Sequence, residues 1–214
     1  MTTDRDSIMC ADSKRDGTGG KYSKPCIYDH RSASTIEWTE TLYTTVPIAE
    51  LLFSDSDAVS ISTDESTVKS WDQARACIET AAKAWLSTVR PNGRPHNAPL
   101  MPVWVDDVPW FTARPTTVKA RNIEDNACCV LTASDSTLDL VIEGTAQRER
   151  DEVRIEDVAA AFQAKYGWKF TLRDGSAFEE SLPGSPEYAF YRVIPRRAFG
   201  YGADGQTATR WRFE

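Results

Sequence analysis

Residues 111–122 read FTARPTTVKARN and place the end of a predicted strand directly before a predicted helix, Thr117–Asp125. The first N–H groups of a helix lack an acceptor within it and carry partial positive charge, so they attract anions. Thr117 and Lys119 add a hydroxyl and an ammonium donor. The stretch predicts a phosphate site, but it equally fits an N-capping threonine followed by a solvated basic face.

The elements around this stretch are short strands with few helices. Downstream, strands are predicted at Ala127–Thr132 and Leu138–Arg148 and a helix at Asp151–Tyr166. After a polar loop rich in Gly, Ser and Pro come strands Tyr188–Ile194 and Thr207–Phe213. Together these elements predict a mainly β fold, a small β-barrel with flanking helices.

Upstream, a hairpin precedes the strand Trp110–Ala113. A strand at Trp85–Arg90 is followed by a tight turn at 91–94 and a return strand, His96–Val105. Pro99 and Pro102 fall within the return strand, which indicates an edge strand or a bulge because proline cannot donate a ladder hydrogen bond.

Composition divides the chain near residue 70. Residues 1–69 are rich in Ser, Thr and Asp, which predicts a disordered, low-complexity extension with one short helix near Ile48–Phe53. Helical spacing begins abruptly at Trp71, with Ser70 as the expected N-cap and Gln73 as its capping-box partner. We therefore predict one domain over residues 70–214.

Charge and apolar pattern limit the partners of the chain. The formal net charge of −7 disfavours binding to nucleic acid and to anionic membranes. No apolar run approaches the roughly 20 residues that span a bilayer, and the N-terminus does not resemble a secretory signal. We expect a cytoplasmic protein with a small-molecule substrate.

Cysteine and histidine are too sparse for the usual metal or triad chemistry. The five cysteines include no CxxC motif, and adjacent Cys128 and Cys129 should face opposite sides of a strand. The two histidines are His30, in the extension, and His96, in the hairpin. We therefore expect no metal site and no catalytic triad, with His96 at a strand surface or a cofactor edge.

The order of segments resembles the pyridoxamine 5′-phosphate oxidase-like superfamily of FMN-binding split barrels, and within it the flavin/deazaflavin-dependent oxidoreductases. The matching segments are Leu86–His96, Phe111-Thr112, Thr117–Asn122, Val141–Ala146, Lys165–Trp168 and Ala208–Phe213. This resemblance implies an FMN-binding split barrel that forms a homodimer, with FMN or coenzyme F420 in a cleft between the subunits.

The same resemblance implies positions for the cofactor. Its ring system would lie along Pro99, Leu100 and Met101, and its phosphate at Thr112, beside Phe111, and at Thr117, Lys119 and Arg121. Trp211 and Arg212 would reach the cofactor of the partner subunit. No catalytic side chain is implied.

The chain also departs from the family. The family often has Ser-Arg-Lys where this chain has Thr117-Val118-Lys119, so one phosphate-binding arginine is absent. True pyridoxamine phosphate oxidases carry an Arg and a Lys where this chain has Ala98 and Val103. Pyridoxamine phosphate oxidation is therefore not expected, and F420 competes with FMN as the cofactor.

The expected function is an oxidoreductase that transfers a hydride to or from a small organic substrate, because the cofactor itself carries that chemistry. The alternative is a non-catalytic flavin or haem carrier on the same barrel, since a fold does not fix a function.

Overall fold

The computed structural model describes residues 46–52, 65–173 and 176–213. Its helices are α1 (Trp71–Thr80), α2 (Val118–Asp125), α3 (Glu152–Tyr166) and the short 3-10 turn η2 (Glu65–Thr67). Its strands are β1 (Ile48–Leu51), β2 (Ala84–Val89), β3 (Pro95–Leu100), β4 (Val103–Val105), β5 (Val108–Ala113), β6 (Cys128–Ser134), β7 (Leu138–Arg148), β8 (Phe170–Arg173), β9 (Ser176–Glu179), β10 (Glu187–Gly202) and β11 (Ala208–Arg212).

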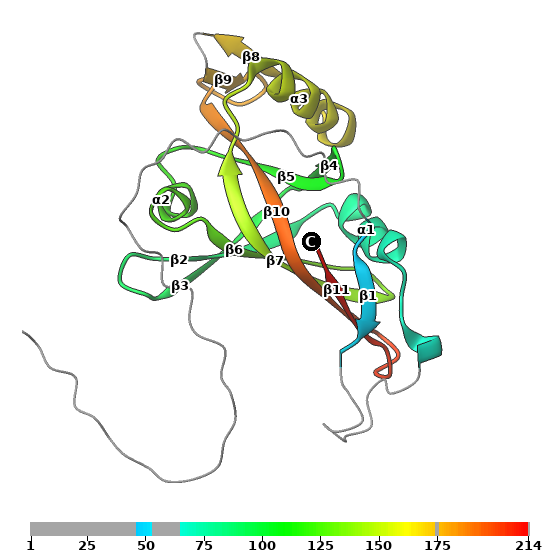
Figure 1. The fold of residues 1–214 in the computed structure, drawn as a ribbon. Coiled ribbons are helices and arrows are strands. Elements are labelled where there is room, and N and C mark those ends of the chain that lie inside the picture. The colour runs from blue at the N-terminus through cyan, green and yellow to red at the C-terminus, as the bar shows by residue number, and fades with distance from the viewer. Residues whose placement is uncertain (1–45, 53–64, 174–175, 214) are drawn as a thin grey trace, which may run out of the picture. The chain divides into compact units, whose positions relative to one another are not determined.

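Within the described residues these strands form one antiparallel sheet, and its main path is β1–β11–β10–β7–β6–β2–β3 (Figure 1). The β4–β5 pair joins this path through β10, and so does the β8–β9 hairpin. In Figure 1, α2 lies beside the β2–β3 hairpin, whereas α3 lies with β8 and β9. The predicted mainly β barrel with flanking helices is confirmed.

Local sequence explains where the two longer helices begin. Ser70 accepts a hydrogen bond from the Gln73 N–H (3.3 Å), and the Gln73 side chain accepts one from the Ser70 N–H (3.0 Å), so the predicted capping box is present. Asp151 caps α3 by accepting from the Arg154 N–H at 2.9 Å. The α3 helix ends at Gly167, whose φ of 74° is left-handed.

The return strand of the hairpin breaks at Met101-Pro102, as its prolines predict. β3 pairs with β2 alone among the described strands and is an edge, while β4 pairs with β5. Side chains of α3 stabilise the break, because Tyr166 Oη and Lys165 Nζ donate to the Pro102 carbonyl at 2.6 and 2.9 Å. The break separates the edge hairpin from the strands that cross beneath α3.

Two segments differ from the sequence prediction. Ile48–Leu51 is strand β1, paired with β11, so the short helix expected near Ile48–Phe53 is wrong; the open edge of β11 outweighs local propensity there. The polar loop expected after α3 contains the β8–β9 hairpin. Residues 1–45 and 53–64, where most of the predicted disorder falls, lie outside the described residues, and the boundary at residue 70 stays a prediction.

The buried residues form two neighbouring clusters. The larger one fills the barrel beneath α1 and α2 and includes Phe111 and Trp211. The smaller one packs α3 against β4, β9 and β10 around Phe162. Cys129 belongs to the barrel core and Cys128 is exposed, as alternation predicts, and burial raises the pKa of the Cys129 thiol to about 12. None of the described helices is long and apolar enough to cross a membrane.

A close approach between β7 and β10 makes Gly144 irreplaceable. A Cβ built on Gly144 would lie 2.1 Å from the carbonyl oxygen of Ile194, a backbone atom. Because a backbone contact cannot relax by a rotamer change, we expect Gly144→Ala to lower the free energy of unfolding by about 3 kcal/mol. A chemical denaturation midpoint equal to that of the wild type would contradict this close contact.

Two truncations separate the extension from the fold. We expect deletion of residues 1–45 to leave the melting temperature unchanged. Deletion of residues 1–67 also removes β1 and the contacts of Glu50 with Arg210 and Arg212 (2.6 and 3.1 Å), which should lower it by about 5 °C without unfolding the barrel. Loss of cooperative melting in the longer deletion would show that the domain begins before residue 68.

Candidate functional site

The N-terminus of α2 is open to an anion. Thr117 occupies the N-cap position, but its hydroxyl donates to the Arg114 carbonyl at 2.8 Å and makes no capping bond to the helix. The first turn of α2 contains no acidic residue that could take over this role. The helix therefore presents partial positive charge that no side chain of the helix neutralises.

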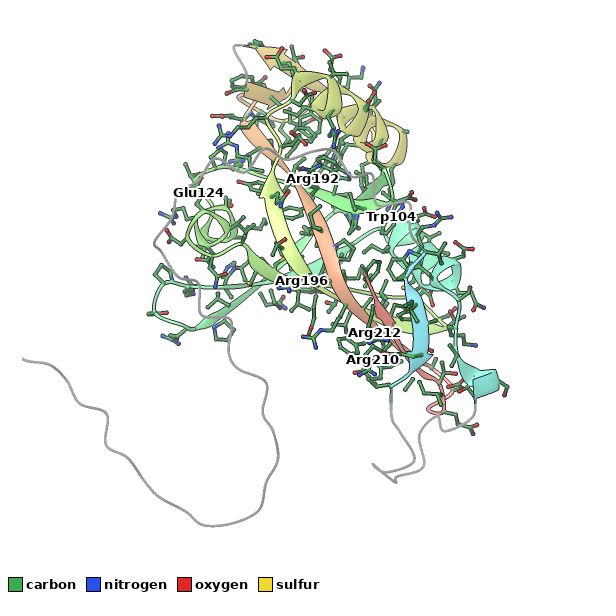
Figure 2. All side chains as sticks on the ribbon, in the orientation of Figure 1. Trp104, Glu124, Arg192, Arg196, Arg210 and Arg212 are labelled. Carbon is green, nitrogen blue, oxygen red and sulfur yellow. The ribbon has the colours of Figure 1, made fainter. Side chains whose placement is uncertain are left out.

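Lys119 lies in this first turn and is half-buried. Burial lowers the pKa of its ammonium group, and no carboxylate pairs with it within the described part of the chain. Burial raises the pKa of the Tyr191 hydroxyl, and the negative charge of Glu124, on the same helix as Lys119 (Figure 2), adds to that increase. A half-buried cation without a counter-ion is costly unless an anionic ligand completes it.

A chain of polar side chains connects α2 with the hairpin. Asn122 of α2 donates from Nδ2 to Thr88 Oγ1 at 2.9 Å, and Thr88 Oγ1 lies 3.5 Å from His96 Nδ1. The pKa of His96 is lowered by burial first, and then by the charges of Arg90 and Lys119. Arg90, at the hairpin, and Lys119, on α2, are thus the two charges that lower the pKa of His96.

The other predicted phosphate residues lie on β5 and α2. Thr112, 8% exposed, is in β5 near the turn that leads to α2, and Arg121 is exposed on α2. Phe111 is different: its side chain is fully buried and stacks on Tyr191, with ring centroids 5.1 Å apart. The Phe111 side chain thus belongs to the barrel core.

The residues predicted to lie along the cofactor ring, Pro99–Met101, are the last two residues of β3 and the residue after it. Pro99 is exposed, Leu100 is buried and Met101 is half-buried. They lead directly into β4, which pairs with β5, the strand that carries Thr112. That Pro99–Met101 and the phosphate residues bind one cofactor stays a prediction.

The two C-terminal residues lie elsewhere in this chain. Trp211 is fully buried in the core and donates from Nε1 to the Lys69 carbonyl at 3.2 Å. Arg212 is exposed and pairs with Glu50. β11 is separated from β2 by β10, β7 and β6, and Figure 2 shows Arg210 and Arg212 beside β1, well away from Glu124 of α2. A role for them at a partner's cofactor stays a prediction.

Arg90 and the Asn122–Thr88–His96 connection were not singled out by the sequence prediction. Thr88 and His96 are cross-strand partners, so the hairpin register could have paired them. Asn122 is 34 residues from Thr88, and nothing local in the sequence links the two.

The arrangement suits a phosphoryl group. It offers an uncapped helix start, a half-buried lysine without a counter-ion, and neighbouring Arg90 and His96, all of which favour an anion. The donor set fits the phosphate end of FMN or of coenzyme F420. The described side chains here include no carboxylate pair for acid–base catalysis.

Comparisons with solved structures found several similar chains. The chain is similar to a NimC/NimA family protein from Clostridium acetobutylicum, with 9% identity and a TM-score of 0.51 over 65% of this chain and 91% of that one. General Stress Protein 26 from Bacillus anthracis is 21% identical, with a TM-score of 0.46 over 60% and 91%. An F420 reductase is 20% identical, with a TM-score of 0.44 over 58% and 94%.

No curated protein matches the chain. A protein-family model does match, over residues 70–201, and the family that it describes is pyridoxamine 5′-phosphate oxidase. The matched segment contains the open start of α2, Lys119 and the hairpin that bears His96. With more than half of the chain matched, the protein belongs to the pyridoxamine 5′-phosphate oxidase family of split barrels.

Proposed function

We propose that the protein is a cytoplasmic oxidoreductase that binds FMN or coenzyme F420 by its phosphate and transfers a hydride to or from a small organic substrate. The observation that carries this proposal is Lys119, half-buried and without a carboxylate partner in the described chain, in the first turn of a helix that lacks a side-chain cap. Membership of a family that includes oxidoreductases supports it.

The side chains of the site would bind and orient the cofactor. Lys119 and the first amides of α2 would hold the phosphate, Thr112 would add a hydroxyl, and Pro99–Met101 would line the ring. When bound, the flavin or deazaflavin ring supplies the hydride chemistry. A site whose side chains only bind and orient the cofactor needs no acid–base pair.

Pyridoxamine phosphate is not the proposed substrate. Ala98 and Val103 stand where true pyridoxamine phosphate oxidases carry cationic side chains, and Val103 is 2% exposed, within the second core. A small apolar residue there cannot replace a cationic contact to phosphate. The family membership is therefore proposed to reflect a shared fold and cofactor rather than a shared substrate.

We also propose a homodimer. The outward face of the hairpin carries Trp85, 49% exposed, whose cross-strand neighbours are Pro99 and Thr132. Val89 is exposed on the same face of β2. An exposed tryptophan that shares a face with the exposed Pro99 and Val89 is typical of an interaction surface. The pairing of Trp85 with Pro99 would place that surface beside the proposed ring segment.

A non-catalytic carrier is the second candidate, favoured by the same lack of acid–base groups. The two functions differ in one measurement. An oxidoreductase should reduce or reoxidise its bound cofactor with a substrate at a rate far above that of the free cofactor, whereas a carrier should not.

Lys119→Ala tests the phosphate site. Loss of a charge-assisted contact worth about 1.5–3 kcal/mol should weaken cofactor binding about ten- to a hundredfold. Without ligand the melting temperature should stay equal or rise slightly, because a half-buried unpaired charge is removed. Fluorescence titration with FMN and with F420, and a thermal melt, measure both effects.

Matched variants accompany that titration. Lys83→Ala removes an exposed lysine outside the site and should change neither quantity. Thr117→Ala loses the bond to the Arg114 carbonyl and should cost about 1 kcal/mol of stability with a weaker effect on affinity. If Lys119→Ala binds both cofactors as tightly as the wild type does, the phosphate lies elsewhere.

Trp85→Glu tests the dimer. A carboxylate in the centre of an apolar interface should yield monomers in light scattering and weaken cofactor binding at least tenfold, since the cleft would lose its second wall. Val153→Glu, at a position 70% exposed on α3, is the control and should stay dimeric. A Trp85→Glu protein that remains dimeric would assign the interface to another face.

A further inference from the structure

One ring nitrogen of His96 contacts Thr88, which is itself hydrogen-bonded to Asn122 of α2. Thr88 and Asn122 are 2% and 3% exposed, so the hydrogen bond between them is shielded from solvent. Thr88 Oγ1 also lies 3.5 Å from His96 Nδ1. Neither nitrogen of His96 makes a hydrogen bond with a carboxylate in the described part of the chain.

The contact with Thr88 fits the tautomer of neutral His96 in which Nδ1 carries no proton. The Thr88 hydroxyl accepts from Asn122 and keeps a proton that it can donate to His96 Nδ1, 3.5 Å away, when that nitrogen carries no proton. With Nδ1 accepting, the ring proton lies on Nε2. The Nε2–H group is therefore the donor that His96 has left for a ligand.

The charged groups that face the ring are cations. Arg90 comes from the hairpin turn and Lys119 from α2, the two elements in contact with this part of β3. The carboxylates of α2, Glu124 and Asp125, lie in its last turn and do not act on the ring. Burial and these two cations lower the pKa of His96, and an anion bound beside it would oppose that shift.

We propose that His96 is a third ligand of the cofactor phosphate, beside Arg90 and Lys119, and that it takes up a proton when the cofactor binds. The inference rests on the proposed function, because it concerns the same phosphate. It makes the affinity of the site dependent on pH through a residue of the chain.

The direction of the pH dependence of cofactor affinity follows from the linkage between proton binding and cofactor binding. In the free protein the pKa of His96 is lowered, by burial first and by the two cations next; a bound anion raises it. Affinity should therefore rise as pH falls through the pKa of His96 in the complex, and level off below its pKa in the free protein. An increase of about one unit on binding corresponds to about a tenfold change in affinity.

The choice of ligand removes a confounding titration. FMN ends in a phosphate monoester that itself gains a proton near pH 6, which opposes the effect of His96. Coenzyme F420 carries a phosphodiester, whose single charge stays constant over this range. The ring hydroxyl of F420 does titrate in this range, so the difference between the wild-type and His96→Gln profiles, rather than the wild-type profile alone, reports His96.

Two measurements test the proposal on the full chain. The chain contains two histidines, so proton NMR titration of the imidazole signals is simple, and a His30→Gln variant assigns them. The midpoint of His96 should rise by about one unit when F420 or FMN is added. Between about pH 8 and about pH 5.5, the affinity for F420 should rise about tenfold more in the wild type than in His96→Gln, which retains only the titration of the ligand.

The outcomes separate the two claims. If Lys119→Ala weakens binding but the His96 midpoint does not move and His96→Gln keeps the wild-type pH profile, the inference is overturned and the proposed function stands. If neither cofactor binds, or if Lys119→Ala binds normally, the proposed function fails and the inference fails with it.

Discussion

The change of partners along β10 is the constraint on which the rest of the structure depends. One edge of β10 pairs with β5 through Ala189–Arg192 and then with β11 through Arg197–Tyr201. The exchange occurs around Pro195, which has no N–H to donate, and the ladder to β7 shifts register between Pro195 and Arg197. The bulge thus marks the point where this edge of β10 changes from β5, which leads to α2, to β11, whose Trp211 lies in the core.

Elements set by local chemistry were predictable, and those set by distant pairing were not. Ser70, the prolines of the return strand and the alternation of Cys128 and Cys129 act through neighbouring residues, and each gave the right structure. β1 exists because the edge of β11, some 160 residues away, is available to it. The β8–β9 hairpin lies in a segment too polar and short for a clear period.

The same division applies to the candidate site. The open helix start and Lys119 could be placed from one stretch of sequence, because a helix terminus is a local feature. That the Thr117 hydroxyl turns back to Arg114 could not, since an N-cap threonine usually bonds its own helix. The contact of Asn122 with Thr88 depends on how α2 packs against β2, and the burial of Trp211 depends on α1 covering β11.

The lowered pKa of Lys119 has a chemical consequence apart from electrostatics. Its ammonium group gives up a proton more readily than that of an exposed lysine, and only the unprotonated amine can be acylated. Lys165, whose pKa is also lowered, is engaged with the Pro102 carbonyl. Acylation at Lys119 would turn the cation into a neutral amide, so covalent labelling and anion binding would compete for the same nitrogen.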